Sequence, residues 1–221
     1  MKSDERFELV RMTGSEAVQK WLALREEGRG VFTPVILDEP ENYALDSDEL
    51  EELQLELPIT LAAAEAVSVA DFFARRKSEN AALWQELATG DWPAVPYKLE
   101  PYLSRHSDEI FIAKVPTPNS YEALAHIGFG GWNDCPYDAE HVAVLRYWHE
   151  RYGADLFAMG GDIIECVVER PPTTREAALN LAREQLLYAP GSLGDFSGGG
   201  SSVPELAAAL LDSPHWLFWW D

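Results

Sequence analysis

The chain ends in His215-Trp-Leu-Phe-Trp-Trp-Asp221, a stretch dominated by large apolar side chains. Successive side chains on a β-strand point to opposite faces, so the aromatic residues at the even positions lie on one face and Leu217 and Trp219 on the other. Each large ring removes roughly 150–250 Å² from water when it is buried, which is worth about 4–6 kcal/mol gross at about 25 cal/mol/Å². We therefore expect an inner strand covered on both faces, and we expect the domain to unfold without it.

The composition describes an acidic chain with enough apolar residues for a core. Its 221 residues are 47% hydrophobic and carry a formal net charge of −21. Two cysteines, Cys135 and Cys166, provide no disulfide framework, and a reducing compartment is the simpler interpretation. The N-terminus has no apolar signal-peptide region, and no stretch reaches the roughly 18 apolar residues of a membrane span. We therefore expect a cytoplasmic protein without membrane contact.

The excess of negative charge limits the partners. Nucleic-acid binding depends on Lys and Arg displacing counterions from phosphate, and here 38 acidic residues face 17 Lys and Arg. No nucleic-acid partner is therefore expected, whereas a basic protein would be attracted. Ordinary solubility charge is the alternative explanation. The sequence does not set the oligomeric state.

The first half of the chain changes character at residue 38. Before it, helical spacing runs from Ser15 to a stop at Gly28. A strand over 31–37 follows, and we place it at or near a sheet edge because Pro34 cannot donate a ladder hydrogen bond. Residues 38–57 hold nine carboxylates and no Lys or Arg. We interpret them as an acidic linker with a transient helix, serving either as an interaction tail or as a solvated connection. The binding candidates there are Glu49, Glu51 and Glu52.

The second half has clearer boundaries. A strand is expected over 109–115, a helix from an Asp138 N-cap to Tyr152 with Gly153 as its stop, and a hairpin over 155–159 and 162–169. Capping patterns open further helices after Thr173 and at Ser202, and 191–202 is a Gly/Ser-rich mobile lid or plain connection. Together, these expected helices and strands predict an α+β fold with a mixed or antiparallel sheet of about five strands (31–37, 109–115, 155–159, 162–169, 215–220) flanked by helices.

We divide the chain into three parts. Residues 1–57 form an N-terminal helix, edge strand and acidic linker that pack on the main body. Residues 58–104 form a helical insert, and residues 105–221 form the α+β domain.

A few residues are candidates for chemistry. Cys135 lies just ahead of a helix N-terminus, where the dipole favours a thiolate, and with Asp134 and His141 it suggests a nucleophilic pair. A half-buried cysteine in a turn is the alternative. His141 and His149 are about 80° apart around the helix, a poor metal pair, so we expect no metal site and no cofactor. His149 is interpreted as a core or interface histidine.

Three further binding candidates flank these residues. The stretch Gly128-Phe-Gly-Gly131 resembles a dinucleotide-binding loop but has no glycine at the third position of that motif. We therefore expect a turn that holds Trp132 against the core, with Asn133 or Asp134 bonding local backbone. Arg146 is expected to form a surface ion pair, or alternatively to bind an anion.

Several blocks in the last 90 or so residues resemble one family. They are Gly130-Gly-Trp-Asn133 with Cys135-Pro136, Glu140-His-Val-Ala-Val-Leu-Arg-Tyr-Trp-His-Glu-Arg-Tyr-Gly-Ala154, Arg170-Pro-Pro-Thr-Thr-Arg-Glu-Ala177, Leu181-Ala-Arg-Glu184 and Phe218-Trp-Trp-Asp221. The sequence is similar to the uncharacterised bacterial domain-of-unknown-function family 4253. The resemblance implies a bacterial, intracellular domain and supplies no activity.

Three functions remain open. The charge and the lack of a recognisable catalytic constellation favour a non-enzymatic, immunity- or adaptor-like protein that binds a basic partner. A subunit or scaffold of a larger assembly is the second hypothesis. The third is a small thiol- or carboxylate-dependent hydrolase centred on Cys135, Asp134 and His141.

Overall fold

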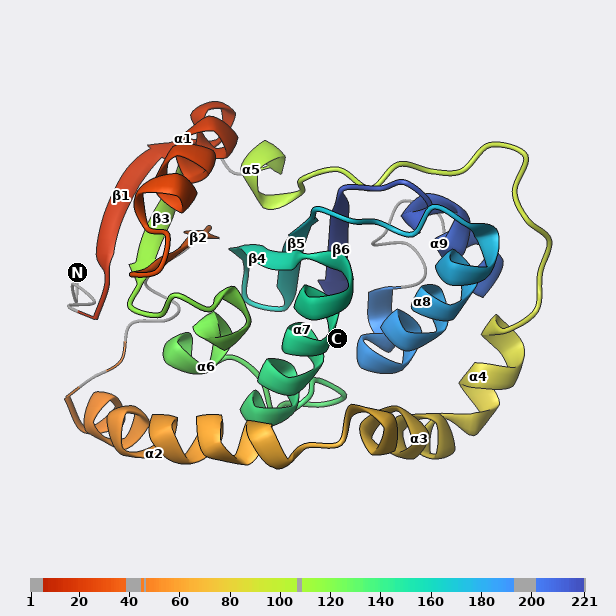
Figure 1. Cartoon of the computed structure of the whole chain (residues 1–221), viewed down its shortest axis with the longest axis horizontal. Helices are drawn as coiled ribbons and strands as arrows, with labels where there is room; N and C mark the ends of the chain where they lie inside the picture. Colours follow the sequence, from red (N-terminus) through yellow and green to blue (C-terminus); the bar gives the residue numbers. More distant parts are fainter. Residues whose placement is uncertain (1–5, 39–44, 46, 107–108, 193–201, 221) are drawn as a thin grey trace.

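A six-stranded mixed sheet organises the computed structural model, which describes residues 6–38, 45, 47–106, 109–192 and 202–220 (Figure 1). Its strands are β1 (Glu8–Thr13), β2 (Thr33–Leu37), β3 (Glu109–Val115), β4 (Ala154–Met159), β5 (Ile163–Val168) and β6 (His215–Trp219), in the spatial order β1-β3-β2-β4-β5-β6. The predicted α+β class is confirmed, with one strand more than expected. The extra strand is β1.

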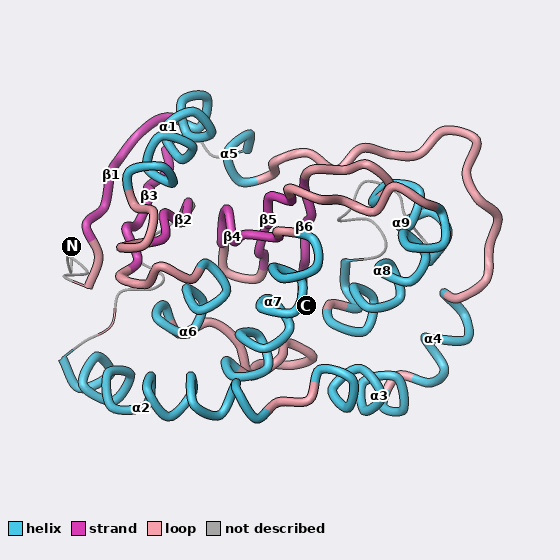
Figure 2. The backbone as a smooth tube through the Cα atoms, in the orientation of Figure 1, coloured by secondary structure: helices cyan, strands magenta, loops and turns pink. Residues whose placement is uncertain are grey.

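Helices cover both faces of this sheet. They are α1 (Gly14–Glu27), α2 (Ser47–Ala66), α3 (Val69–Glu79), α4 (Ala81–Leu87), α5 (Leu103–His106), α6 (Ala123–Ile127), α7 (Asp138–Tyr152), α8 (Arg175–Tyr188) and α9 (Val203–Leu210), with 3-10 turns η2 (Ser120–Glu122) and η3 (Pro190–Ser192). Figure 2 shows the strands between α1 and α5 on one side and α6, α7 and α2 on the other. Trp21 of α1 and Leu103 of α5 belong to the smaller core, and Trp148 of α7 belongs to the larger one.

The terminal strand packs its aromatic face into the larger core. Trp216, Phe218 and Trp220 are fully buried. Phe218 stacks on Trp148 with ring centroids 5.4 Å apart and planes inclined by 8°, and Tyr188 meets the same phenylalanine edge-on at 5.1 Å. Aromatic side chains of both α7 and α8 therefore contact β6 directly.

The prediction of an inner strand was wrong, because β6 lies at one end of the strand order. Only one of its faces is completely covered, and Leu217 and Trp219 on the other face are half-buried. The outer edge is covered by η3 instead, where the Trp219 amide donates to Ser192 Oγ at 2.9 Å. A side-chain acceptor thus takes the place of a neighbouring strand.

Strand β2 lies in the interior of the sheet, so the edge position predicted from Pro34 was also wrong. The pairing explains why proline is tolerated there. β2 runs antiparallel to β3 along its length but pairs in parallel with β4 only at Ile36 and Leu37. Pro34 lies outside that short parallel ladder, and its carbonyl accepts a hydrogen bond of 2.8 Å from the Trp21 indole.

The acidic segment becomes helical at residue 47, where the sequence predicted a linker with a transient helix. Helix α2 runs through Pro58 to Ala66 and packs Leu57 and Leu61 against α6 and α7. The expected division at 57/58 falls inside α2, and the division at 104/105 falls inside α5. Of the expected linker, residues 39–44 and 46 lie outside the described residues, as do residues 193–201 of the Gly/Ser-rich loop.

Among the described residues, no single helix has the length and apolar character to cross a bilayer. Helices α2 and α3 reach that length and apolar character only together, and they are bent by 88° relative to each other.

Helix boundaries in the second half follow local capping chemistry. Gly153 closes α7 in the left-handed conformation, with φ 62°, as predicted. The N-cap of α7 is Tyr137 and not Asp138, which lies in the first turn. Thr174 caps α8 by accepting from the Ala177 amide at 3.2 Å.

We predict that Phe218→Ala lowers the free energy of unfolding by about 3–5 kcal/mol, because a fully buried ring is lost from close packing. Leu217→Ala, on the half-buried face of the same strand, is the matched control and should cost clearly less. Urea denaturation followed by tryptophan fluorescence measures both. Equal losses would contradict the assignment of the aromatic face as the one that carries the packing.

Candidate functional site

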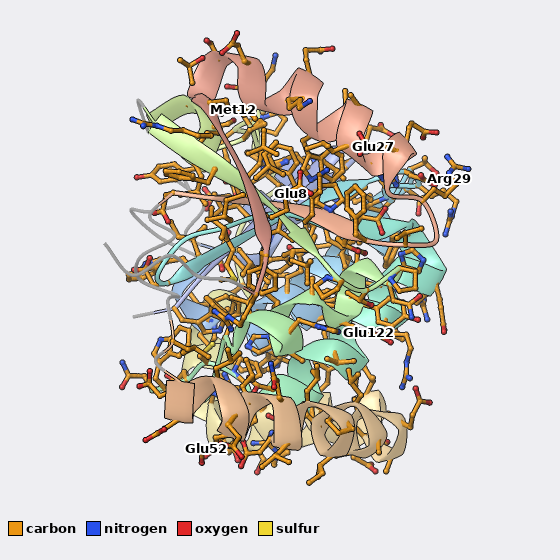
Figure 3. The ribbon with its side chains drawn as sticks, turned by 90° about the vertical axis from the view of Figure 1, so that its left-hand side faces the viewer. Glu8, Met12, Glu27, Arg29, Glu52 and Glu122 are labelled. Carbon is orange, nitrogen blue, oxygen red and sulfur yellow. The ribbon has the colours of Figure 1, made fainter. Side chains whose placement is uncertain are left out.

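A cavity of about 330 Å³ opens between α1, β2, η2 and the start of β4. Its walls come from Trp21, Arg25 and Glu26 of α1, from Arg29 to Pro34, from Pro118 to Ser120, and from His149, Asp155, Leu156 and Glu169. Figure 3 shows Arg29 at the outer end of α1. The site combines aromatic walls with charged side chains from both halves of the chain.

Asp155 is the centre of the polar network in this cavity. One of its oxygens, Oδ1, accepts hydrogen bonds from Ser120 Oγ at 2.6 Å and from His149 Nδ1 at 2.9 Å, and the other accepts from Arg25 Nη2. Burial by itself would raise the pKa of Asp155, but the hydrogen bonds from His149 and Ser120 and the charge of Arg25 outweigh it and lower the pKa. The carboxylate is therefore held ionised.

The turn after α7 brings His149 and Asp155 together. Gly153 donates its N–H to the His149 carbonyl at 2.8 Å and reverses the chain, and β4 begins at the next residue. A Cβ on Gly153 would lie 2.9 Å from the Cβ of Glu169 and would need the left-handed conformation as well. The glycine is therefore required for this reversal.

His149 is more accessible than its partner Asp155, with 42% of its side chain exposed against 12%. Its hydrogen bond to Asp155 raises its pKa above the ordinary value and outweighs the opposing effect of partial burial. The cationic form is therefore favoured. A cation at this place also suits the C-terminal end of α7, where the helix dipole is negative.

Two arginines complete the charged wall. Arg25 bridges Asp155 and Glu169, the latter at 2.9 Å, and Arg29 pairs with Glu26 at 2.8 Å. All of these contacts use Nη2 alone. In the described part of the chain, no oxygen atom accepts a hydrogen bond from the remaining N–H groups of either guanidinium ion.

The predicted thiol site lies elsewhere, inside the larger core. Cys135 Sγ is 3.3 Å from His141 Nε2, and His141 Nδ1 is 2.5 Å from Tyr188 Oη. Burial raises the pKa of Cys135 to about 12 and lowers the pKa of His141 to about 3. Thiol and imidazole are therefore both neutral at neutral pH, and the pair is a buried hydrogen-bonded link. Gly130, with φ 125°, leaves the space that His141 fills.

The third residue of that predicted site points away from it. Asp134 is 68% exposed, and its carboxylate lies 3.9 Å from the Arg76 guanidinium. The buried Arg76 side chain donates to the Asp134 carbonyl at 2.6 Å and to the Leu187 carbonyl at 3.0 Å. Arg76 thus ties the turn before α7 to the end of α8.

The remaining predicted binding residues are dispersed. Trp132 packs half-buried against Phe129, and Asn133 is exposed at φ 45°. Arg146 pairs with Glu65 and donates to the Ala64 carbonyl at 3.1 Å, so it anchors α2 on α7. The three glutamates named from the sequence, Glu49, Glu51 and Glu52, are exposed on α2.

Sequence reasoning missed Arg25, Ser120 and Asp155, because nothing in their local patterns links elements so far apart. It also missed Glu165, a fully buried carboxylate that accepts from the Tyr102 and Leu103 amides and lies 2.7 Å from His215 Nε2. A lone carboxylate inside the apolar run of β5 was the available signal.

The chain belongs to the domain of unknown function (DUF4253) family, whose model matches residues 111–221. No curated protein and no solved structure matches the chain. The matched part contains Ser120, His149 and Asp155, whereas Arg25 and Arg29 precede it. Within the ranges that the structure describes, no group of three or more His, Cys, Asp or Glu side chains is placed to hold a metal ion.

The depressed pKa of His141 predicts a loss of stability in acid. At pH values between about 3 and 6.5, the imidazole of His141 is protonated in the unfolded chain but stays neutral in the folded chain. This residue should therefore make the protein less stable as pH falls below 6.5, by about 2 kcal/mol between pH 7 and pH 5. Urea denaturation of wild type and His141→Gln at both pH values measures the effect, and the difference between the two proteins should shrink by that amount in acid. A difference that does not change with pH would contradict it.

Proposed function

We propose that the chain binds a small oxyanion, a carboxylate or a phosphate, in the cavity between α1 and the end of α7. The observation that carries this function is the pair of arginines, Arg25 and Arg29, with uncommitted N–H groups at one cavity. Guanidinium ions present several N–H donors in a fixed plane that matches the oxygens of carboxylate and phosphate.

The local charge supports an anionic ligand in a protein that is otherwise strongly acidic. The whole chain has 38 acidic residues against 17 Lys and Arg, but the cavity walls hold Arg25, Arg29 and His149 against an equal number of carboxylates. Each of those carboxylates, on Glu26, Asp155 and Glu169, is already paired with one of the cations. An entering anion therefore meets little uncompensated negative charge at this site.

The shape of the cavity limits the ligand to a small molecule. A volume of about 330 Å³ lies at the lower end of the roughly 300–1,000 Å³ of ligand pockets. Trp21, Phe32 and Pro34 supply an apolar wall for the carbon part of the ligand. A free phosphate and a small aromatic carboxylate share the required chemistry, and only the second would use that wall.

This function differs from the binding role expected from the sequence, in which the partner was a basic protein. The cytoplasmic location remains a prediction, which the two unpaired and buried cysteines, Cys135 and Cys166, support.

Inorganic phosphate and benzoate, added separately, are expected to raise the Tm of the wild-type protein, because a ligand that binds only the folded state stabilises it by about 2.7 kcal/mol at one hundred times its Kd. Arg29→Gln should weaken both ligands at least tenfold, and with 77% of its side chain exposed the substitution should leave the fold intact. Thermal shift and isothermal titration calorimetry measure the two quantities.

Arg183→Gln on α8 is the matched control, since it removes the same charge from a side chain that does not line the cavity. Potassium chloride at equal ionic strength controls for screening. Benzoate binding tighter than phosphate would identify the organic ligand class. Equal weakening by Arg29→Gln and Arg183→Gln, or no stabilisation by either anion, would refute the function.

The affinity for both anions should also fall as pH rises through the pKa of His149, because the positive charge of this side chain is then lost.

A further inference from the structure

Helix α2 has two apolar faces, and only one of them is used for packing. The inner face rests on α6 and α7, with Ala64 buried and with Leu57 and Leu61 half-buried against Ala125 and Val142. Figures 1 and 3 place α2 on the side of the molecule opposite α1, and Figure 3 shows Glu52 on the outward side of the helix. The outer face is therefore independent of the cavity described above.

The outer face alternates carboxylates with exposed apolar side chains. Leu55 is 66% exposed and Ile59 is 69% exposed, and their spacing of four residues places them one turn apart on the same face. Glu51, Glu52 and Glu56 are exposed beside them. The sequence of α2 contains no Lys or Arg.

The carboxylates of this face repel one another. Glu52 and Glu56 are four residues apart, a spacing at which like charges destabilise a helix. A second effect appears across the interface with α7, where burial and the charge of Glu56 raise the pKa of Asp138 to about 6. The negative charge here thus acts against the isolated fold, and an added cation would relieve it.

We propose that the outer face of α2 docks a basic amphipathic helix of another protein. Lysines or arginines of that helix would meet Glu51, Glu52 and Glu56, and its apolar residues would cover Leu55 and Ile59. Charge complementarity selects this occupant, since a second copy of α2 would bring like charges together. Anionic lipid headgroups would be repelled for the same reason. The acidic and apolar positions of α2 recur with the period of a helix. A partner that is itself an amphipathic helix has the same period and can therefore contact both sets of side chains.

A synthetic amphipathic helix of leucine and lysine, labelled with a fluorophore, is the probe, and fluorescence anisotropy with the full chain is the readout. The wild-type protein is expected to bind it with an affinity that falls as salt rises. The triple variant Glu51→Gln, Glu52→Gln, Glu56→Gln should bind at least tenfold more weakly. The double variant Leu55→Ser, Ile59→Ser should also lose tenfold, with an unchanged dependence on salt. Far-UV circular dichroism establishes that both variants keep their helices.

A second triple variant separates a docking face from general attraction to an acidic protein. Glu100→Gln, Glu150→Gln and Glu176→Gln remove the same charge from exposed positions outside α2, in the segment before α5, on α7 and on α8, and together they should change the affinity less than threefold. If this variant loses as much as the α2 triple, or if Leu55→Ser with Ile59→Ser has no effect, the docking face is excluded. Neither result bears on anion binding at Arg29, which is measured separately.

Discussion

The contact between Phe218 and Trp148 joins the last strand to helix α7, and the positions of most functional candidates depend on it. The two rings are stacked, and Tyr188 of α8 closes on the same phenylalanine. Once α7 is fixed by this contact, one of its histidines, His141, enters the core and the other, His149, reaches the cavity at the end of the helix. Loss of the aromatic contact would therefore displace both networks.

Buried polar groups also hold segments of the chain in place around the aromatic core. A buried charge or polar group is costly unless it is hydrogen-bonded, and His141, Asp155 and Glu165 each have partners from other segments. Asp155 links η2, α7 and α1, so that Arg25 from outside the family-matched region helps to complete a site inside it. Glu165 accepts from the Tyr102 and Leu103 amides and so fixes the approach to α5, on the face of the sheet that α1 also covers.

Local signals in the sequence were sufficient for most elements and insufficient for their arrangement. The strand over 109–115 was predicted with the bounds that the structure has, and the helix ending at Tyr152 was predicted to within one residue at its start, because capping and alternation are local properties. Strand β1 was missed, since an edge strand with exposed Glu8 and Arg11 has little apolar alternation. The interior place of Pro34 depends on how far β4 pairs with β2, which no local pattern encodes. Likewise, the sequence named His149 but not the residues that surround it.

The highest local stability is expected in the terminal strand and its helical cover, although β6 lies at the end of the sheet. Native-state hydrogen exchange at increasing denaturant tests this most directly. The backbone amides of Trp216 and Phe218 are expected to exchange only through global unfolding, with the same free energy as the amides at the centre of α7. If those β6 amides exchange by local opening while α7 stays protected, the aromatic contact does not hold the fold together.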